Sequence, residues 1–302
     1  MKIGEAEIWL RQELNSIYDE REASNIADLV LENLTGLSRV DRLTKKEERL
    51  VVQQLHHLTE IHHRLMRHEP IQYALGEAHF YGLKLFVDKH VLIPRPETEE
   101  LVDWIVKDVQ ASGKNVFERR ESEADETTQL KILDVGTGSG CIALALKKSM
   151  PKAEVWGCDV SDDALNVARR NGSELDIRVD FVGVNFLDAA QTKQLPTVDI
   201  IVSNPPYIPL KNKEEMHPNV VEYEPHTALF VPNDEALIFY KTLAEFGKHR
   251  LYENGSIYAE IHEDMGKEVV NLFEKEGYKV ELRKDMQEKE RTVKARKKNV
   301  DC

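Results

Sequence analysis

The chain has 302 residues, 41% of them hydrophobic, which is long enough for two domains. Its formal net charge of −13 at pH 7 argues against a large electrostatic footprint on nucleic acid, which normally appears as a basic face. No apolar run approaches the ~18 residues that a membrane span requires, and the N-terminus lacks the cationic and apolar segments of an export signal. The three cysteines form no Cys-x-x-Cys pair, which fits a reducing cytoplasm.

Residues 1–75 are predicted to form a small helical bundle, because apolar residues recur along them with helical spacing. Gly36 stands where a helix would stop. Thr44 and Glu47 form a capping-box pattern, which predicts that a third helix begins there. Five histidines between residues 56 and 68 suggest a metal site, but no pair has the His-Glu-x-x-His arrangement, so we expect no metal.

Residues 76–95 are predicted to form a β-hairpin linker, since residues 79–87 alternate weakly between apolar and polar. Pro96 is well placed to begin a helix at the start of a second domain, residues 96–302. Arg95 and Thr98 either contact a ligand or the domain interface, or serve only to start and cap this helix. Residues 113–129 are acidic and polar, and their composition predicts a solvated, mobile loop.

An apolar strand at residues 130–135 leads into Gly136-Thr137-Gly138-Ser139-Gly140 and then into a predicted helix at residues 141–150. Glycines let the backbone turn tightly and approach a ligand, and the helix presents free N–H groups at its start. The G-x-G-x-G spacing differs from both the dinucleotide-binding pattern and the P-loop. A second strand, at residues 154–158, ends in Asp159, whose carboxylate can accept hydrogen bonds from both hydroxyls of a ribose.

The rest of the chain alternates strands with helices, which predicts an α/β fold with a doubly wound, Rossmann-like sheet. Further strands are expected at residues 180–184, 198–203 and 256–261, and further helices at residues 161–171, 235–251 and 264–275. The last two runs, at residues 279–283 and 291–297, predict an antiparallel hairpin that closes the sheet.

The most informative segment is Asn204-Pro205-Pro206-Tyr207, which follows the strand at residues 198–203. Two consecutive prolines fix φ and donate no N–H, so the carbonyls of Asn204 and Pro205 can point into a cleft. An asparagine side chain beside such carbonyls can hold an NH2 group. Ligands of open α/β sheets bind at the C-terminal ends of the strands, where this segment is predicted to lie.

These motifs resemble those of S-adenosylmethionine-dependent methyltransferases. Residues 134–140 are similar to the first motif of that class, Asp159 to its ribose-binding acid, and residues 204–207 to the motif of enzymes that methylate planar nitrogens. The segments at residues 92–99 and 224–230 resemble the HemK/PrmC family of protein-(glutamine-N5) methyltransferases, which modify the Gly-Gly-Gln glutamine of peptide chain release factors. The resemblance covers nearly the whole chain.

One segment departs from the pattern of that family. Residues 260–266 read Glu-Ile-His-Glu-Asp-Met-Gly, where the family usually has Glu-Ile-Gly followed by a glutamine. This difference predicts that one wall of the pocket is built from other side chains.

The resemblance implies a class I methyltransferase fold, S-adenosylmethionine as co-substrate, and release factors as protein substrates that dock on the N-terminal bundle. It also implies a cytoplasmic monomer that needs no metal, no membrane and no direct contact with nucleic acid. The expected cofactor-binding residues are Gly136, Thr137, Gly138, Ser139, Gly140, Asp159, Phe186 and Asn204. The expected catalytic residues are Asn204, Pro205 and Tyr207, and the expected substrate-binding residues are Asn204, Pro205, Pro206 and Tyr207.

The expected mechanism follows from the weak basicity of an amide nitrogen, whose lone pair is delocalised into the carbonyl. The side-chain oxygen of Asn204 and the backbone carbonyl of Pro205 are expected to accept hydrogen bonds from the two N–H groups of the substrate glutamine. Tyr207 either packs against the flat amide or forms only an apolar wall, and Phe186 lies either beside the adenine or in the core. Two alternatives stay open, namely a nucleic-acid amino (adenine) methyltransferase and a cofactor-binding protein without turnover.

Overall fold

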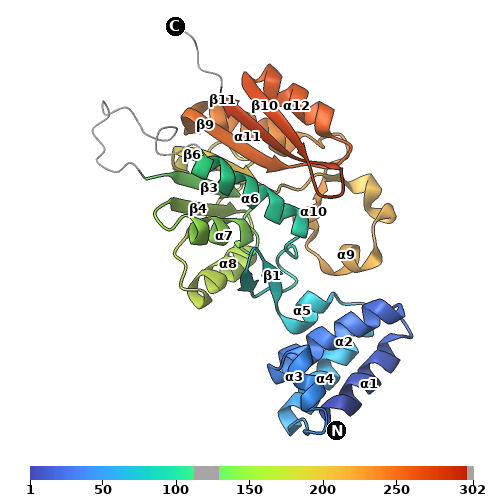
Figure 1. Cartoon of the computed structure of the whole chain (residues 1–302). Helices are drawn as coiled ribbons and strands as arrows, with labels where there is room; N and C mark the ends of the chain where they lie inside the picture. The colour runs from blue at the N-terminus through green and yellow to red at the C-terminus, as the bar shows by residue number, and fades with distance from the viewer. Residues whose placement is uncertain (112–128, 298–302) are drawn as a thin grey trace. The chain divides into compact units, whose positions relative to one another are not determined.

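The computed structural model describes residues 1–111 and 129–297 and divides into two compact units (Figure 1). One unit comprises residues 1–77 together with 217–223, and the other comprises residues 78–216 and 224 onward. The predicted loop at residues 113–129 lies, apart from Gln129, outside the described residues.

The first unit is a bundle of helices around its own apolar core. The helices of the bundle are α1 (Ile3–Leu14), α2 (Glu20–Thr35), α3 (Arg39–Thr44), α4 (Val52–Leu65) and α5 (Ile71–Leu75). Helix α9 (Pro218–Tyr223) belongs to the same unit but buries none of its residues. Leu10, Leu14 and Leu31 are fully buried in the core, as the helical spacing of apolar residues predicts. Helix α9 comes from a distant part of the chain, and the Tyr223 hydroxyl donates to the Arg67 carbonyl at 2.5 Å.

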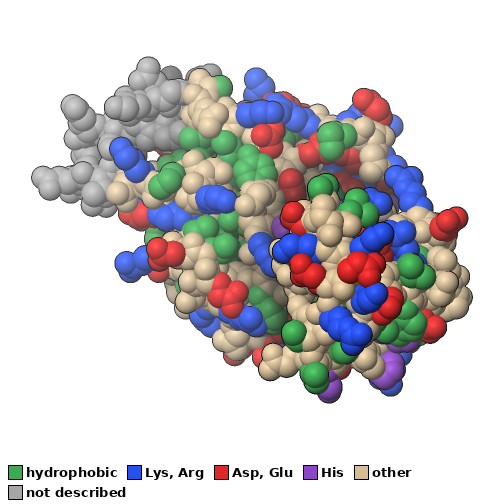
Figure 2. Space-filling model, turned by 60° about the horizontal axis from the view of Figure 1, so that its bottom comes forward, with side chains coloured by type: hydrophobic (Ala, Val, Ile, Leu, Met, Phe, Trp, Pro, Cys, Tyr) green, Lys and Arg blue, Asp and Glu red, His purple; other side chains and the backbone are tan. Residues whose placement is uncertain are grey.

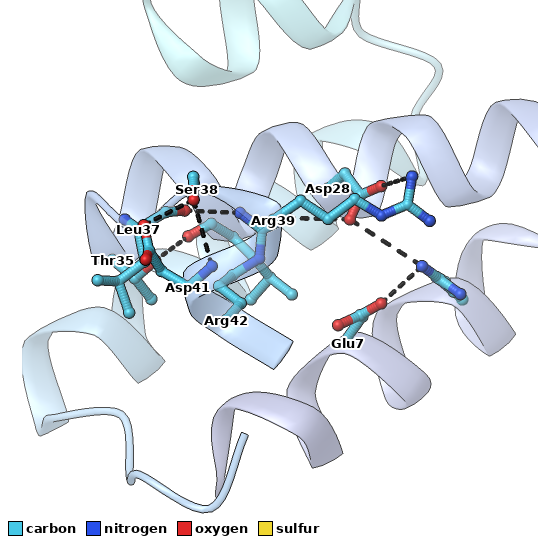
Figure 3. A network of polar contacts seen from close by, with 10 residues as sticks. Glu7, Asp28, Thr35, Leu37, Ser38, Arg39, Asp41 and Arg42 are labelled. Atoms are coloured by element: carbon cyan, nitrogen blue, oxygen red, sulfur yellow. Dashed lines mark hydrogen bonds and ion pairs between the residues drawn. The ribbon is translucent and has the colours of Figure 1, made fainter. Parts of the chain in front are cut away.

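A polar network ties α3 to α2 inside this bundle (Figure 3). The Arg42 side chain is 1% exposed, and its guanidinium donates to the Asp28 carboxylate at 2.9 Å and to the Leu37 carbonyl at 2.8 Å. Asp28 also lies 3.4 Å from Arg39 and 4.0 Å from Arg11. A buried charge without a partner is costly, so this network holds Arg42 in place through hydrogen bonds from both of its terminal nitrogens, Nη1 and Nη2.

The predicted capping box at Thr44 is wrong. Thr44 is the last residue of α3, and Glu47 forms an ion pair with Lys2 at 2.6 Å instead of capping a helix. The next helix begins eight residues later, where the Val51 N–H donates to Gln54 at 3.0 Å. The local capping-box pattern is thus overridden by Lys2, a partner of Glu47 that is distant in sequence.

The second unit begins with the predicted hairpin, formed by β1 (Ala78–Phe80) and β2 (Leu83–Leu85). Tyr81 and Gly82 both have positive φ, 47° and 69°, as the two-residue turns that suit the twist of a hairpin require. Asn171 then fixes the chain after the hairpin, because its side chain bonds both the N–H and the carbonyl of Phe86.

The main sheet has seven strands in the order β10-β11-β9-β6-β3-β4-β5. The five strands from β9 to β5 run parallel, and β11 is antiparallel to both of its neighbours, which confirms the doubly wound sheet and its closing hairpin. The strands are β3 (Lys131–Val135), β4 (Glu154–Asp159), β5 (Asp180–Gly183), β6 (Val198–Ser203), β9 (Leu251–Glu260), β10 (Tyr278–Lys284) and β11 (Glu290–Lys297).

Helices cover both faces of this sheet (Figure 1). Helices α6 (Pro96–Ala111) and α7 (Cys141–Ser149) pack with Ile132 and Val202 on one face, and α11 (Ile238–Arg250) and α12 (Gly266–Lys275) pack with Leu133 on the other. The remaining elements are α8 (Asp162–Glu174), α10 (His226–Leu229), the short strands β7 (Ile208–Pro209) and β8 (Phe230–Val231), and the 3-10 turns η2 (Gln191–Gln194) and η3 (Leu210–Glu215). Within the described ranges, no helix combines the length and the apolar character of a membrane span.

Candidate active site

Four parallel strands end at one edge of the sheet and bring seven of the predicted site residues to a single pocket. This follows from the sheet order, because β5, β4, β3 and β6 are successive neighbours and their carboxyl ends meet. The pocket is lined from these strand ends by Gly136, Gly138, Asp159, Phe186 and Asn204. It encloses ≈ 800 Å³ of space free of protein atoms, open mouth included, within the range of small-molecule sites.

The glycine turn after β3 exposes bare backbone to this pocket. Gly136 and Gly138 have φ of 72° and 53°, and a Cβ added to either would meet no protein atom within 4 Å. Both residues line the pocket, so such a Cβ would project into ligand space. A ligand can therefore approach the backbone here more closely than any other residue type would allow.

A fully buried carboxylate holds the turn in this shape. Asp134 accepts hydrogen bonds from the Thr137 hydroxyl at 2.6 Å and from the Ala143 N–H at 3.2 Å, which joins the turn to the start of α7. Burial raises the pKa of Asp134 to about 7, although these two hydrogen bonds act in the opposite direction.

Asp159 faces the same turn from the end of β4. Its carboxylate accepts from the Gly138 N–H at 2.9 Å and from the Ser161 N–H at 3.0 Å. Burial raises its pKa, and the backbone hydrogen bonds oppose that rise. Each carboxylate oxygen can accept more than one hydrogen bond, so Asp159 can also hold hydroxyl groups of a ligand.

Aromatic and proline side chains form the apolar part of the pocket. Phe186 is 5% exposed and packs edge-on against Phe246, with ring centroids 5.2 Å apart. Phe239 and Pro225 add apolar surface. Such a wall suits the flat face of a heteroaromatic ring.

The Asn-Pro-Pro-Tyr segment leaves the sheet at the end of β6. The Ser203 hydroxyl donates to the Val135 carbonyl at 2.8 Å, which ties this strand end to the glycine turn. Asn204, Pro205 and Pro206 line the pocket, and the Asn204 Nδ2 donates to the Thr98 hydroxyl at 3.1 Å. Tyr207 is not among the residues that line the pocket; burial raises its pKa to about 12, and its ring lies edge-on to His262 at 5.8 Å.

Three of the expected cofactor residues are not brought to this pocket. Thr137 and Ser139 are 3% and 2% exposed, and the Thr137 hydroxyl is directed to Asp134. Gly140 is the N-cap residue before α7 and has φ of 80°, and a Cβ there would lie 3.1 Å from Phe181, so this glycine permits close packing. Their direct contact with a cofactor stays a prediction, and the structure gives them a role in shaping the turn.

Two models of protein families match this chain. The PrmC N-terminal domain matches residues 5–76, and the Methyltransferase small domain matches residues 121–223. The release factor glutamine methyltransferase of Flavobacterium psychrophilum is 42% identical over 284 residues, which cover 94% of this chain and 95% of the relative. The chain belongs to this family.

Two further relatives carry the same activity in their names. The release factor glutamine methyltransferase of Bacteroides thetaiotaomicron is 39% identical over 288 residues, 95% of this chain and 97% of the relative. Among solved structures, the release-factor-specific protein-(glutamine-N5) methyltransferase of Alicyclobacillus acidocaldarius is 25% identical and covers 68% of this chain and 94% of its own, with a TM-score of 0.38.

The pocket fits the co-substrate of a release factor glutamine methyltransferase. S-adenosylmethionine contains a ribose, an adenine ring and a methyl group on a sulfonium, and the pocket offers a carboxylate, an apolar wall and an open backbone turn. Within the described residues, no three His, Cys, Asp or Glu side chains lie where they could hold a metal ion together.

Sequence reasoning missed the carboxylates that hold the segments around this site. Glu224 is buried and accepts from the Arg95 guanidinium at 2.6 Å and from the Ile93 N–H at 3.3 Å, so the segments at residues 92–99 and 224–230 are joined directly. Glu260 is also buried and accepts from the Thr98 hydroxyl at 2.7 Å. The sequence gives no signal for the partner of Glu224, and for Glu260 it indicates only that a glutamate at the end of an apolar strand needs a partner.

Proposed function

We propose that this chain transfers the methyl group of S-adenosylmethionine to the side-chain amide nitrogen of the Gly-Gly-Gln glutamine of peptide chain release factors. The observation that carries this proposal is the position of the Asn204 side chain. It lines the pocket, and its Nδ2 donates a hydrogen bond to the Thr98 hydroxyl, so its Oδ1 is the amide atom that can accept a hydrogen bond from a substrate. The names of relatives that match over almost their full length support the same substrate. Release factors act in the cytoplasm, which is where we place this activity.

The chemistry requires the glutamine nitrogen to be held rather than deprotonated. Its lone pair is delocalised into the carbonyl, so the nitrogen carries no extra proton that a general base would have to remove before the reaction. The Asn204 Oδ1 and the Pro205 carbonyl accept hydrogen bonds from its two N–H groups, and these acceptors stabilise the positive charge that develops on nitrogen. S-adenosylmethionine supplies the methyl group: a nitrogen–carbon bond forms, the sulfur–carbon bond breaks, and the nitrogen then loses one proton to water.

The remaining residues hold the two substrates. Asp159 accepts the ribose hydroxyls, Gly136 and Gly138 leave room beside the backbone, and Phe186 packs against the adenine. Tyr207 does not line the cofactor pocket, and we assign its buried ring to the side of the glutamine, as an apolar wall for the amide.

The alternative substrate is an adenine amino group, which presents the same planar nitrogen to Asn204 and Pro205. Enzymes that act on a base in nucleic acid need surface that attracts phosphates. This chain carries a net charge of −13, and on the face drawn in Figure 2 basic and acidic side chains are interspersed. These observations favour the protein substrate.

The test uses methyl-labelled S-adenosylmethionine, a class I release factor, and a copy of that factor whose Gly-Gly-Gln glutamine is replaced. Label should appear only on the intact factor. The Asn204→Ala variant should lose at least ~10²-fold in rate, by analogy with the loss of one preorganised hydrogen-bonding group. Asn166→Ala, a change of the same type at an exposed position outside the pocket, serves as its control. Near-normal turnover by a folded Asn204→Ala protein would refute the role of Asn204.

A further inference from the structure

A buried acid lies behind Asn204, on the side away from the pocket. Strands β6 and β9 are neighbours with Ser203 opposite Ala259, so Asn204, the first residue after β6, comes next to Glu260, the last residue of β9. Glu260 is 3% exposed and accepts from the Thr98 hydroxyl at 2.7 Å. The same hydroxyl oxygen accepts from Asn204 Nδ2 at 3.1 Å.

The number of available protons decides which groups donate and which accept in the hydrogen bonds that join Glu260, Thr98 and Asn204. An ionised carboxylate can only accept, so the single hydroxyl proton of Thr98 is committed to Glu260. The Thr98 oxygen can then only accept from Asn204, which must present its NH2 group to Thr98. The other amide atom, Oδ1, is the one left for a substrate. Were Glu260 protonated, it could donate to Thr98, and Thr98 could donate to Oδ1 with the amide reversed.

We propose that Glu260 and Thr98 are positioning residues that fix the orientation of the Asn204 side-chain amide. The inference rests on the proposed function, because it assigns a role to the atom that receives the glutamine N–H. Neither residue touches the substrate. Both act by ensuring that Asn204 offers an acceptor rather than a second donor, which would repel the donor NH2 group of the substrate.

Several charged and titratable groups surround Glu260. The nearby cationic groups Arg291 on β11 and Arg95 before α6 favour the carboxylate, whereas Glu97 opposes it. The Tyr240 hydroxyl on α11 donates to the Glu260 carbonyl at 3.0 Å. Burial is the largest influence and raises the pKa of Glu260 to about 7, so its charge changes near neutral pH. Among the described residues, the carboxyl of Glu260 also acts electrostatically on Tyr207 and on Cys141.

A double-mutant cycle tests the link from Thr98 to Asn204. Thr98→Val keeps the shape of the side chain but removes the hydroxyl, and should lower kcat about tenfold or more while the dissociation constant of S-adenosylmethionine is unchanged. Thr98→Ser keeps the hydroxyl and should retain most of the rate. In the Asn204→Ala background, Thr98→Val should change the rate less than about twofold, because residues that act only through Asn204 have nothing left to orient.

The outcomes separate this inference from the proposed function. An unmodified release factor with the wild-type enzyme would refute the proposed function itself. If the release factor is modified and Asn204 is required, equal rates of Thr98→Val and Thr98→Ser would overturn the inference alone, as would a full tenfold loss in the Asn204→Ala background. Should Thr98→Val fail to fold, the pH profile of Glu260→Gln decides, because the wild-type rate should fall below neutral pH and that of the variant should not.

Discussion

The methylation rate should depend on pH through the ionisation of Glu260. The perturbation is a change of pH from 8 to 6 across the pKa of about 7 that burial gives this carboxyl. One pH unit above the pKa about nine-tenths of a carboxyl is ionised, and one unit below about one-tenth is. If only the ionised form holds the Asn204 amide in the productive orientation, kcat should fall about tenfold between these two pH values.

The assay is the initial rate of label transfer to a saturating release factor, measured in steps across this range. Glu260→Gln has no group to titrate at this position, and the glutamine can accept from Thr98 in one of its two orientations. Its rate should therefore be lower than that of the wild type at pH 8 and nearly independent of pH. Thr98→Ser, which preserves the chain of hydrogen bonds, should show the wild-type profile.

A second carboxyl could imitate this behaviour, and the design separates the two. Asp134 also has a pKa raised to about 7, and it lies under the glycine turn rather than behind Asn204. The Glu260→Gln variant still contains Asp134, so a profile that keeps the wild-type inflection in this variant would refute the role of Glu260. The dissociation constant of S-adenosylmethionine, measured by calorimetry over the same pH range, would then show whether Asp134 is responsible.

Three further predictions concern the cofactor pocket and the bundle. Asp159→Asn should weaken binding of S-adenosylmethionine about 10- to 100-fold in calorimetry, since a hydrogen bond to a charged group contributes ~1.5–3 kcal/mol. Gly138→Ala should weaken binding and cost about 1–2 kcal/mol of stability because of its positive φ, whereas Gly36→Ala should lower the melting temperature without affecting the cofactor. Arg42→Met should destabilise the bundle by about 3 kcal/mol in thermal melting, against less than ~1 kcal/mol for Arg39→Met, whose side chain is 67% exposed.

The sheet could be predicted from the sequence because its signals are local. The parallel strands contain short apolar runs, and a glycine or polar residue follows two of the central ones, Gly136 after β3 and Asn204 after β6. Once the strands are placed, the rule that ligands bind at their carboxyl ends puts Asp159 and Asn204 at one edge. The positions of Gly136, Gly138 and Phe186 at the pocket follow from the same logic.

Contacts between distant segments could not be predicted in this way. Thr98 and Glu260 are 162 residues apart, and Arg95 and Glu224 are 129 apart, so no spacing rule connects them. Thr98 was open to several roles from the sequence, because a threonine in the first turn of a helix usually caps it. Its hydroxyl instead lies between Glu260 and Asn204, and only the packing of α6 beside β9 makes that contact available.

The segment that departs from the usual family pattern, residues 260–266, lies beside Tyr207. Glu260 and Ile261 match the pattern, so the acid that bonds Thr98 is retained, and the first different residue is His262. The His262 ring lies edge-on to Tyr207, with centroids 5.8 Å apart. A glycine at this position would lack this ring contact with Tyr207. The change therefore adds a ring contact to Tyr207 and leaves the hydrogen bonds from Glu260 through Thr98 to Asn204 untouched. Under the proposed role of Tyr207 beside the glutamine amide, His262→Gly should alter KM for the release factor more than kcat.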